Sequence, residues 1–184
     1  MKEEFLNLLR SVDREGIEDL IKFIESTDFF KAPASTRFHG NFDGGLVTHS
    51  LKVYEILKEK LKHVPVEMNV SEDTIKIVAL LHDICKVNFY KVDYRNAKNE
   101  LGVWEKVPYY TVDDTIPYGH GEKSVMMITE YMKLTVEEKY AIRWHMGLSE
   151  PKELYGTIGS AFTKYPLALM LFEADLEATY LFDI

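Results

Sequence analysis

The strongest constraint on the fold of this chain is a helical period of apolar residues that includes histidines and a carboxylate. In residues 46–61 the apolar positions form one stripe, and His49 lies on it. Two later stripes include His82 and Asp175 in the same way. A buried imidazole or carboxylate costs free energy unless it is paired. We therefore expect several helices to aim polar side chains at one another inside a common core.

The pattern predicts an all-α bundle of about six to seven helices in a single domain covering residues 1–184. Ser71 is a favourable N-cap, Thr135 and Glu138 have the form of a capping box, and Pro166 suits the first turn of a last helix. A loop is expected around Pro151, Gly156 and Gly159. The predicted helices lie near residues 3–12, 16–26, 46–61, 71–85, 121–132, 135–145 and from 166 onward.

Residues 88–114 differ from the rest because they are rich in Tyr, Phe, Val and Trp and are interrupted by RNAKNELG. This composition favours a small β-hairpin or an irregular arm over another helix. Trp104, Tyr109 and Tyr110 could stack on a base, but the favoured expectation is that the hairpin packs onto the domain.

Composition narrows the function classes. The apolar runs are too short to cross a bilayer, and no signal peptide is expected. The single cysteine, Cys85, excludes an intramolecular disulfide and favours a reducing cytoplasm; its place on an apolar stripe predicts a structural role. Thirty acidic and 22 basic residues give a net charge of −8, which disfavours wrapping a long polyphosphate.

Four predicted helices each aim a metal-capable side chain inward: His49, the pair His82-Asp83, His145 and Asp175. Imidazoles and carboxylates that converge from different helices form transition-metal sites in bundles. Adjacent helical residues point about 100° apart, so His82 and Asp83 can share one ion only if it lies beside the helix between them. The mixed ligands suit Mn, Fe, Co, Ni or Zn better than Ca, without choosing among them.

The order His49, His82-Asp83, Asp175 resembles the signature of the HD superfamily of metal-dependent phosphohydrolases. The segments FHGNFDGGLVTHSLKV, ALLHDICKV, YTVDDTIPYGH, AIRWHMG and FEADLEATY look most like the HD domain of bacterial 3′-to-5′ exoribonucleases. Those relatives carry an additional OB-fold ahead of that domain, and we expect none within these residues. The chain also has Gly40 after His39 and Met146 after His145, where such relatives often show paired histidines.

The resemblance implies an HD-like helical fold and one or two divalent ions that activate water for attack on phosphorus. It assigns His49, His82, Asp83 and Asp175 to the first ion, and Asp83, His120 and His145 to the second. Asp83, as the bridge, and Lys86, as a phosphate contact, are the predicted catalytic residues. The remaining expected substrate contacts, which are weaker, are Arg143, His39 and Lys123.

The expected function is hydrolysis of a phosphoester or phosphoanhydride of a nucleotide or short oligonucleotide. A single-strand 3′-to-5′ exonuclease and a non-catalytic nucleotide-binding regulatory module remain alternatives, as does a purely structural domain whose polar groups pair with one another. Individually, His120 could be a helix cap, His145 a satisfied core imidazole and Lys86 a solvated lysine. A small phosphorylated substrate is favoured over long nucleic acid, no membrane partner is expected, and oligomerisation stays open.

Overall fold

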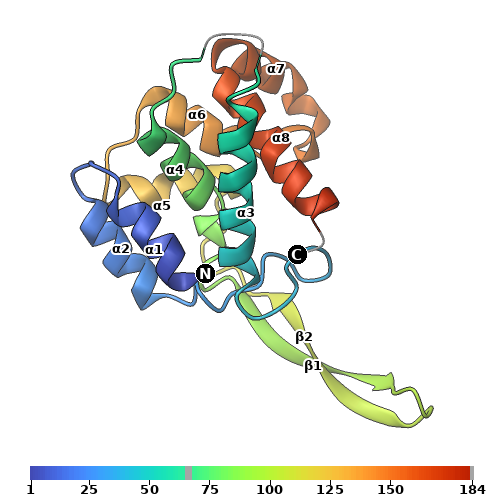
Figure 1. Ribbon diagram of the computed structural model, residues 1–184. Helices are drawn as coiled ribbons and strands as arrows, with labels where there is room; N and C mark the ends of the chain where they lie inside the picture. The colour runs from blue at the N-terminus through green and yellow to red at the C-terminus, as the bar shows by residue number, and fades with distance from the viewer. Residues whose placement is uncertain (65–67, 183–184) are drawn as a thin grey trace.

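The computed structural model describes residues 1–64 and 68–182, and it shows a helical body from which one long β-hairpin projects (Figure 1). Within these residues there are eight α-helices, three short 3-10 helices and one two-stranded sheet. The helices are α1 (Lys2–Arg10), α2 (Ile17–Ser26), α3 (Gly45–Lys60), α4 (Glu72–Leu81), α5 (His120–Thr129), α6 (Val136–Trp144), α7 (Tyr155–Lys164) and α8 (Pro166–Leu181). The strands are β1 (Tyr90–Lys98) and β2 (Trp104–Val112), and the 3-10 helices are η1 (Ile84–Lys86), η2 (Gly147–Ser149) and η3 (Lys152–Leu154).

Three helices begin where the sequence predicts. The Ser71 hydroxyl accepts a hydrogen bond from the Thr74 backbone N–H at 3.1 Å and starts α4. Both hydrogen bonds of the capping box between Thr135 and Glu138 are present at the start of α6, and Pro166 lies in the first turn of α8. These local signals are confirmed because each one satisfies or removes a backbone N–H that the first helical turn leaves without a partner.

The prediction of a loop around residues 151–159 is wrong. This segment forms η3 and then α7, so the described residues contain one helix more than expected. Ile158 and Ala161 of α7 are buried in the core, and α7 packs on α8. Each of the two glycines in α7 destabilises the helix by about 1 kcal/mol relative to alanine. Burial of the apolar face of α7 outweighs this cost. No helix in the described ranges is both long and apolar enough for a bilayer.

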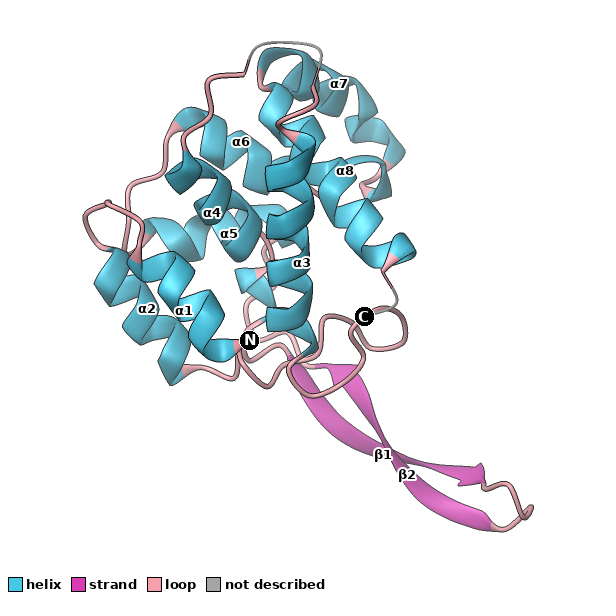
Figure 2. Ribbon diagram, viewed as in Figure 1, coloured by secondary structure: helices cyan, strands magenta, loops and turns pink. Residues whose placement is uncertain are grey.

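The core of the body lies between α3, α4, α6 and α8. α3 packs against α4 and α8, and α6 packs against both α8 and α5 (Figure 2). All residues of α4 from Thr74 to Leu81 are buried, as expected for a central helix. α1 and α2 form the predicted N-terminal pair, and α1 packs on α3 and α4. Four central helices therefore bring their side chains to the same interior region.

The hairpin forms as predicted, but it does not pack onto the domain. β1 and β2 pair antiparallel, with Tyr90 opposite Val112 at the body and Lys98 opposite Trp104 at the far end. Figure 1 shows the ribbon extending away from the helices. The side chain of Tyr94 is 62% exposed and that of Trp104 is 66% exposed. The two strands satisfy each other's backbone hydrogen bonds, so the arm keeps its shape while only its root lies against the body.

Candidate metal centre

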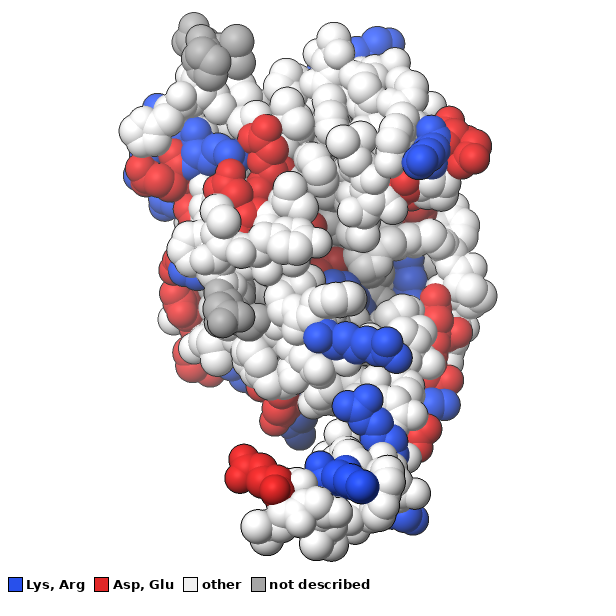
Figure 3. All heavy atoms as spheres, turned by 90° about the vertical axis from the view of Figure 1, so that its right-hand side faces the viewer, with Lys and Arg blue, Asp and Glu red and all other residues white. Residues whose placement is uncertain are grey.

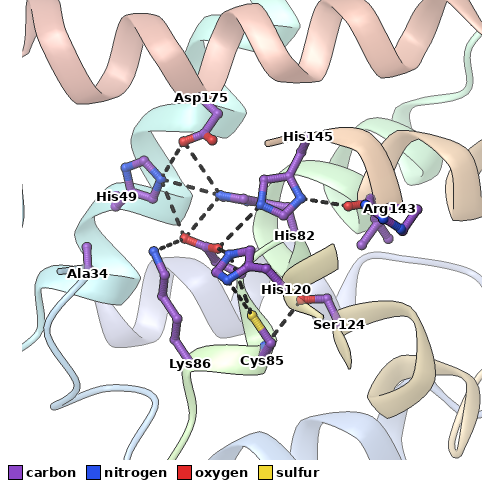
Figure 4. A network of polar contacts seen from close by, with 12 residues as sticks. Ala34, His49, His82, Cys85, Lys86, His120, Ser124, Arg143, His145 and Asp175 are labelled. Atoms are coloured by element: carbon purple, nitrogen blue, oxygen red, sulfur yellow. Dashed lines mark hydrogen bonds and ion pairs between the residues drawn. The ribbon is translucent and has the colours of Figure 1, made fainter. Parts of the chain in front are cut away.

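The six predicted ligands lie together in the interior of the body. Figure 4 shows His49, His82, His120, His145 and Asp175 pointing toward one another. They come from α3, from the end of α4 and the residue after it, from the start of α5, from the end of α6 and from α8. Four of them are almost fully buried, and His120 and Asp175 are partly buried at the edge. The donor cluster comprises His49, His82, Asp83, His120, His145 and Asp175.

The two carboxylate oxygens of Asp83 face two different sets of imidazoles. Oδ2 lies 3.5 Å from His82 Nε2 and 3.8 Å from His49 Nε2. Oδ1 lies 2.6 Å from His120 Nε2 and 3.5 Å from His145 Nε2. Asp83 is thus placed between two groups of nitrogen donors, which is the arrangement that a bridging carboxylate requires.

Asp175 completes the first of these groups. Its Oδ1 lies 2.9 Å from His49 Nε2 and 3.9 Å from His82 Nε2. Burial opposes ionisation of both carboxyl groups in the cluster. Lys86 and the imidazoles outweigh this effect at Asp83, and the hydrogen bond from His49 outweighs it at Asp175, so the pKa of each carboxyl is lowered. Both carboxylates are charged at neutral pH.

Backbone carbonyls fix the orientation of two of the imidazoles. The His82 Nδ1–H donates to the carbonyl of Ala79 at 2.8 Å, and the His145 Nδ1–H donates to the carbonyl of Ile142 at 2.6 Å. Because a carbonyl only accepts, each ring must carry its proton on Nδ1 and direct the Nε2 lone pair into the cluster. His145 Nε2 is buried and has no hydrogen-bond partner among the described residues. Imidazole Nε2 atoms directed at two buried carboxylates form a donor set that fits a divalent cation.

Local backbone structure brings these residues together. α4 ends at Leu81 and the chain continues into η1, so His82 and Asp83 lie at a change of helix type and both face the cluster. Gly121 follows His120 at the start of α5, and a Cβ atom there would collide with the carbonyl of Arg143 in α6. Glycine therefore allows the two helices to approach closely, which places His120 beside His145, with ring centroids 5.2 Å apart.

Lys86 lies in the cluster as well. Its ammonium is 2.6 Å from Oδ2 of Asp83, and its side chain is 12% exposed. Burial favours the neutral amine, but the carboxylate of Asp83 outweighs it and raises the pKa of Lys86. Lys86 is therefore a fixed positive charge at the wall of the site and not a solvated lysine.

Cys85 also contacts the donor cluster, which its sequence pattern did not predict. Its Sγ lies 3.6 Å from both ring nitrogens of His120, and Asp83, Cys85 and His120 offer three ligand atoms within 4.8 Å of one another. Burial lowers the pKa of His120, but hydrogen bonds with Asp83 and Cys85 outweigh it and raise the pKa to about 9. The sequence pattern places Cys85 on the apolar stripe of α4. In the structure η1 turns Cys85 toward α5, so its contact with His120 was not predicted.

His39 lies on the loop before α3, next to His49, with ring centroids 4.8 Å apart. Both of its ring nitrogens are buried without a hydrogen-bond partner in the described structure. Burial, and then the neighbouring His49, lower the pKa of His39 to about 4, so this imidazole is neutral. Gly40 has φ = +60° and the position of its Cβ would lie 2.6 Å from Cβ of Ala34, which excludes a second histidine there.

A cavity of about 750 Å³ opens beside the donor cluster. Figure 3 shows this face of the molecule hollowed near its centre. Asp83, His120, His145 and Asp175 line the cavity together with Lys86, His39 and Met146. Arg37 and Tyr90 also line it, and no sequence signal singled them out. The volume lies within the range of small-molecule sites, about 300–1,000 Å³.

Two predicted substrate contacts, Arg143 and Lys123, do not line this cavity. Arg143 is paired with Glu122 and with Glu150, and it lines a different surface depression with Trp144. Lys123 donates to Asp114 at 2.7 Å. Neither residue lines the cavity at the donor cluster. Lys123 instead lines a smaller hollow together with His120 and Lys86. Helical spacing without tertiary contacts does not reveal which of these hollows a side chain lines.

Comparison with known proteins adds an independent observation. The model of the family described as HD domain matches residues 46–178, which is more than two thirds of the chain and includes all six members of the donor cluster. The chain belongs to the HD domain family. No curated protein and no solved structure matches it significantly. The closer similarity to exoribonucleases stays a prediction.

HD domains generally bind divalent metal ions, and the family generally contains metal-dependent hydrolases of phosphate compounds. The His and Asp residues of this chain could hold such an ion, because among the described residues they form, together with Cys85, three groups whose ligand atoms lie within 4.8 Å of one another. The group of His49, His82 and Asp83 shares His82 with the second group and Asp83 with the third. Buried, deprotonated nitrogen and oxygen donors are the ligands that divalent transition metals prefer.

Proposed function

We propose that this HD domain protein hydrolyses a phosphoester or phosphoanhydride bond of a nucleotide or short oligonucleotide. The observation that carries the proposal is the position of Asp83, whose two oxygens face separate imidazole sets at the wall of a cavity. His49, His82, Asp83 and Asp175 would hold a first divalent ion, and Asp83, His120 and His145 a second. Bound there, divalent ions supply Lewis-acid activation of water and of a phosphate oxygen.

The residues around the cluster have their own part in this reaction. Lys86 keeps its positive charge beside Asp83, so its ammonium can donate a hydrogen bond to a phosphate oxygen and offset the charge that develops there. His39 is neutral and lines the cavity, so one ring nitrogen can donate to the substrate. Asp83 and His145, which line the cavity, are themselves buried, and the low dielectric constant around buried groups strengthens these interactions.

A non-catalytic nucleotide-binding module would need the same cavity but no metal-dependent turnover. A purely structural domain would need the polar groups to satisfy one another, and the buried His145 Nε2 without a described partner argues against it. The hydrolase, the regulatory module and the structural domain differ in the bound metal and the turnover that they predict, so one experiment distinguishes the three.

The test is to purify the full chain without chelator, measure its bound metal, and assay bis(p-nitrophenyl) phosphate, nucleotides and dinucleotides with Mn, Co, Ni, Fe or Zn ions. We expect bound metal and metal-dependent hydrolysis that Asp83→Asn abolishes. Bound nucleotide without turnover under any of these ions would favour the regulatory module. Absence of both bound metal and hydrolysis would favour the structural domain.

A further inference from the structure

The two faces of the β-hairpin arm differ in chemistry. Antiparallel register places paired residues on the same face, and successive residues alternate between faces. One face, here called the aromatic face, consists of Tyr90, Val92, Tyr94, Asn96 and Lys98 of β1 and of Trp104, Lys106, Pro108, Tyr110 and Val112 of β2. It carries four aromatic side chains, two lysines and no acidic residue. The opposite face carries both acidic residues of the strands, Asp93 and Glu105.

The aromatic face begins inside the cavity of the donor cluster. Tyr90 and Val112, the pair at its root, both line that cavity, and the Tyr90 hydroxyl donates to the carbonyl of Ala34 at 3.1 Å. The next pair on this face, Val92 and Tyr110, lines a second hollow of about 680 Å³ at the base of the arm. The face therefore leads from the site outward without a break.

The second hollow is basic. Arg37 lines it, Arg95 lines it from the face of β1 opposite the aromatic face, and there is no Asp or Glu among its described lining residues. Thr36 and Arg37 line this hollow and the cavity of the donor cluster alike, so the two are adjacent. Figure 3 shows Lys and Arg side chains gathered between the central hollow and the arm. In a chain with a net charge of −8, a hollow that is lined by two arginines and by no acidic residue is suited to an anion.

The outer part of the aromatic face is freely accessible. Tyr94 is 62% exposed and Trp104 is 66% exposed, and the ammonium of Lys98 lies over the Trp104 ring at 5.3 Å from its centroid. Residues on one face of a strand are about 7 Å apart. This spacing is similar to that of consecutive nucleotides in an extended single strand, whose bases stack on aromatic side chains while its phosphates contact lysines.

We propose that the aromatic face of the arm binds the nucleotides of a single-stranded oligonucleotide that extend away from the phosphoester held at the donor cluster. The inference rests on the proposed function, because it takes that phosphoester as the anchored end of the substrate. Arg37 contacts the first phosphate beyond the cavity, and Tyr110, Tyr94 and Trp104 provide successive stacking surfaces. From Tyr90 to Lys98 the arm spans about 27 Å, which accommodates about four nucleotides.

The test measures binding of the full chain, as purified, to fluorescent phosphorothioate oligonucleotides of about two to eight residues, which resist hydrolysis. Affinity is expected to rise with length up to about four or five residues and then to level off. Tyr94→Ala should weaken binding of the long oligonucleotide about ten-fold and binding of the dinucleotide much less. Lys106→Ala should reduce the slope of log affinity against log salt by about one.

Lys91→Ala is the matched control. Lys91 is an exposed lysine of the same strand pair, but it belongs to the opposite face, so its removal changes the net charge equally and should leave affinity unchanged. Equal weakening by Lys91→Ala and Lys106→Ala would overturn the proposal, because it would show a general effect of charge. Affinity independent of length would overturn it as well.

A second copy of the chain is the competing occupant of this face. A dimer that Tyr94→Ala dissociates, together with no binding of oligonucleotides, would overturn the proposal and assign the face to self-association. If the proposed function is wrong but the role of the arm is right, the protein will bind oligonucleotides with length-dependent affinity and hydrolyse no phosphoester. Hydrolysis of bis(p-nitrophenyl) phosphate without length-dependent binding would leave the function in place and remove the role of the arm.

Discussion

The donor cluster and the aromatic face of the arm both present polar chemistry to a ligand, but the chain positions them by different means. The cluster takes its side chains from four α-helices and from the segment after α4, so its geometry depends on packing of the whole body. The arm takes its side chains from two adjacent strands whose register is local. Changes in the cluster should therefore affect metal, stability and turnover together, whereas changes in the arm should affect binding alone.

The largest expected effect comes from Asp83→Asn, which keeps the volume of the side chain and removes the charge shared by both imidazole sets. Hydrolysis should fall by more than about 1,000-fold, and bound metal should be lost from the purified protein. Asp114→Asn is the matched control, because Asp114 pairs with Lys123 outside the cluster. Elemental analysis and turnover measure both results. Full metal content in the Asp83 variant would contradict the assignment.

Removal of the ion itself should destabilise the body. An ion present at 1,000 times its Kd stabilises the folded state by about 4 kcal/mol, which corresponds to a Tm higher by about 8–16 °C for a chain of this size. We expect chelator to lower the Tm by this amount in the unsubstituted protein and to have no effect on Asp83→Asn. An unchanged Tm in both proteins would show that the body does not hold an ion.

The stability of the metal-free protein should depend on pH through the protonation of His120. Its pKa in the folded protein is about 9, above the ordinary value of 6.5. The protonated ring therefore contributes stability that is complete below about pH 6.5 and is lost as the pH rises through 9, by at most about 3 kcal/mol. Thermal unfolding across this range measures the loss. His120→Gln should remove the trend, and an identical pH profile in that variant would contradict the assignment.

The smallest effect on stability is expected in the arm. Trp104→Ala removes a mostly exposed side chain at the far end of the ribbon, so the free energy of unfolding should change by less than about 0.5 kcal/mol. Leu80→Ala, which removes a fully buried side chain of α4, should cost about 2–5 kcal/mol in the same denaturant titration. A large destabilisation by Trp104→Ala would show that the arm is part of the cooperative core and would end the contrast between the two regions.

Local patterns in the sequence were sufficient to predict much of the helical body. The caps at Ser71 and Thr135 and the proline at position 166 mark the starts of α4, α6 and α8, because a cap depends only on residues within one turn. The loop predicted around residues 151–159 failed for the opposite reason. Burial of Ile158 and Ala161 against distant residues overrides the local signal of two glycines.

The sequence by itself determined which polar side chains face inward, because helical period alone places His49, His82 and Asp175 on apolar stripes. Only the tertiary structure decided how they divide around the two oxygens of Asp83, since the 3-10 turn after α4 and the close approach of α5 and α6 set those directions. The tertiary structure also places Arg143 outside the cavity, and it lets the arm project away from the helical body. Contacts between segments far apart in the chain have no signature in any single segment, and they decide which of the inward-facing groups act as one site.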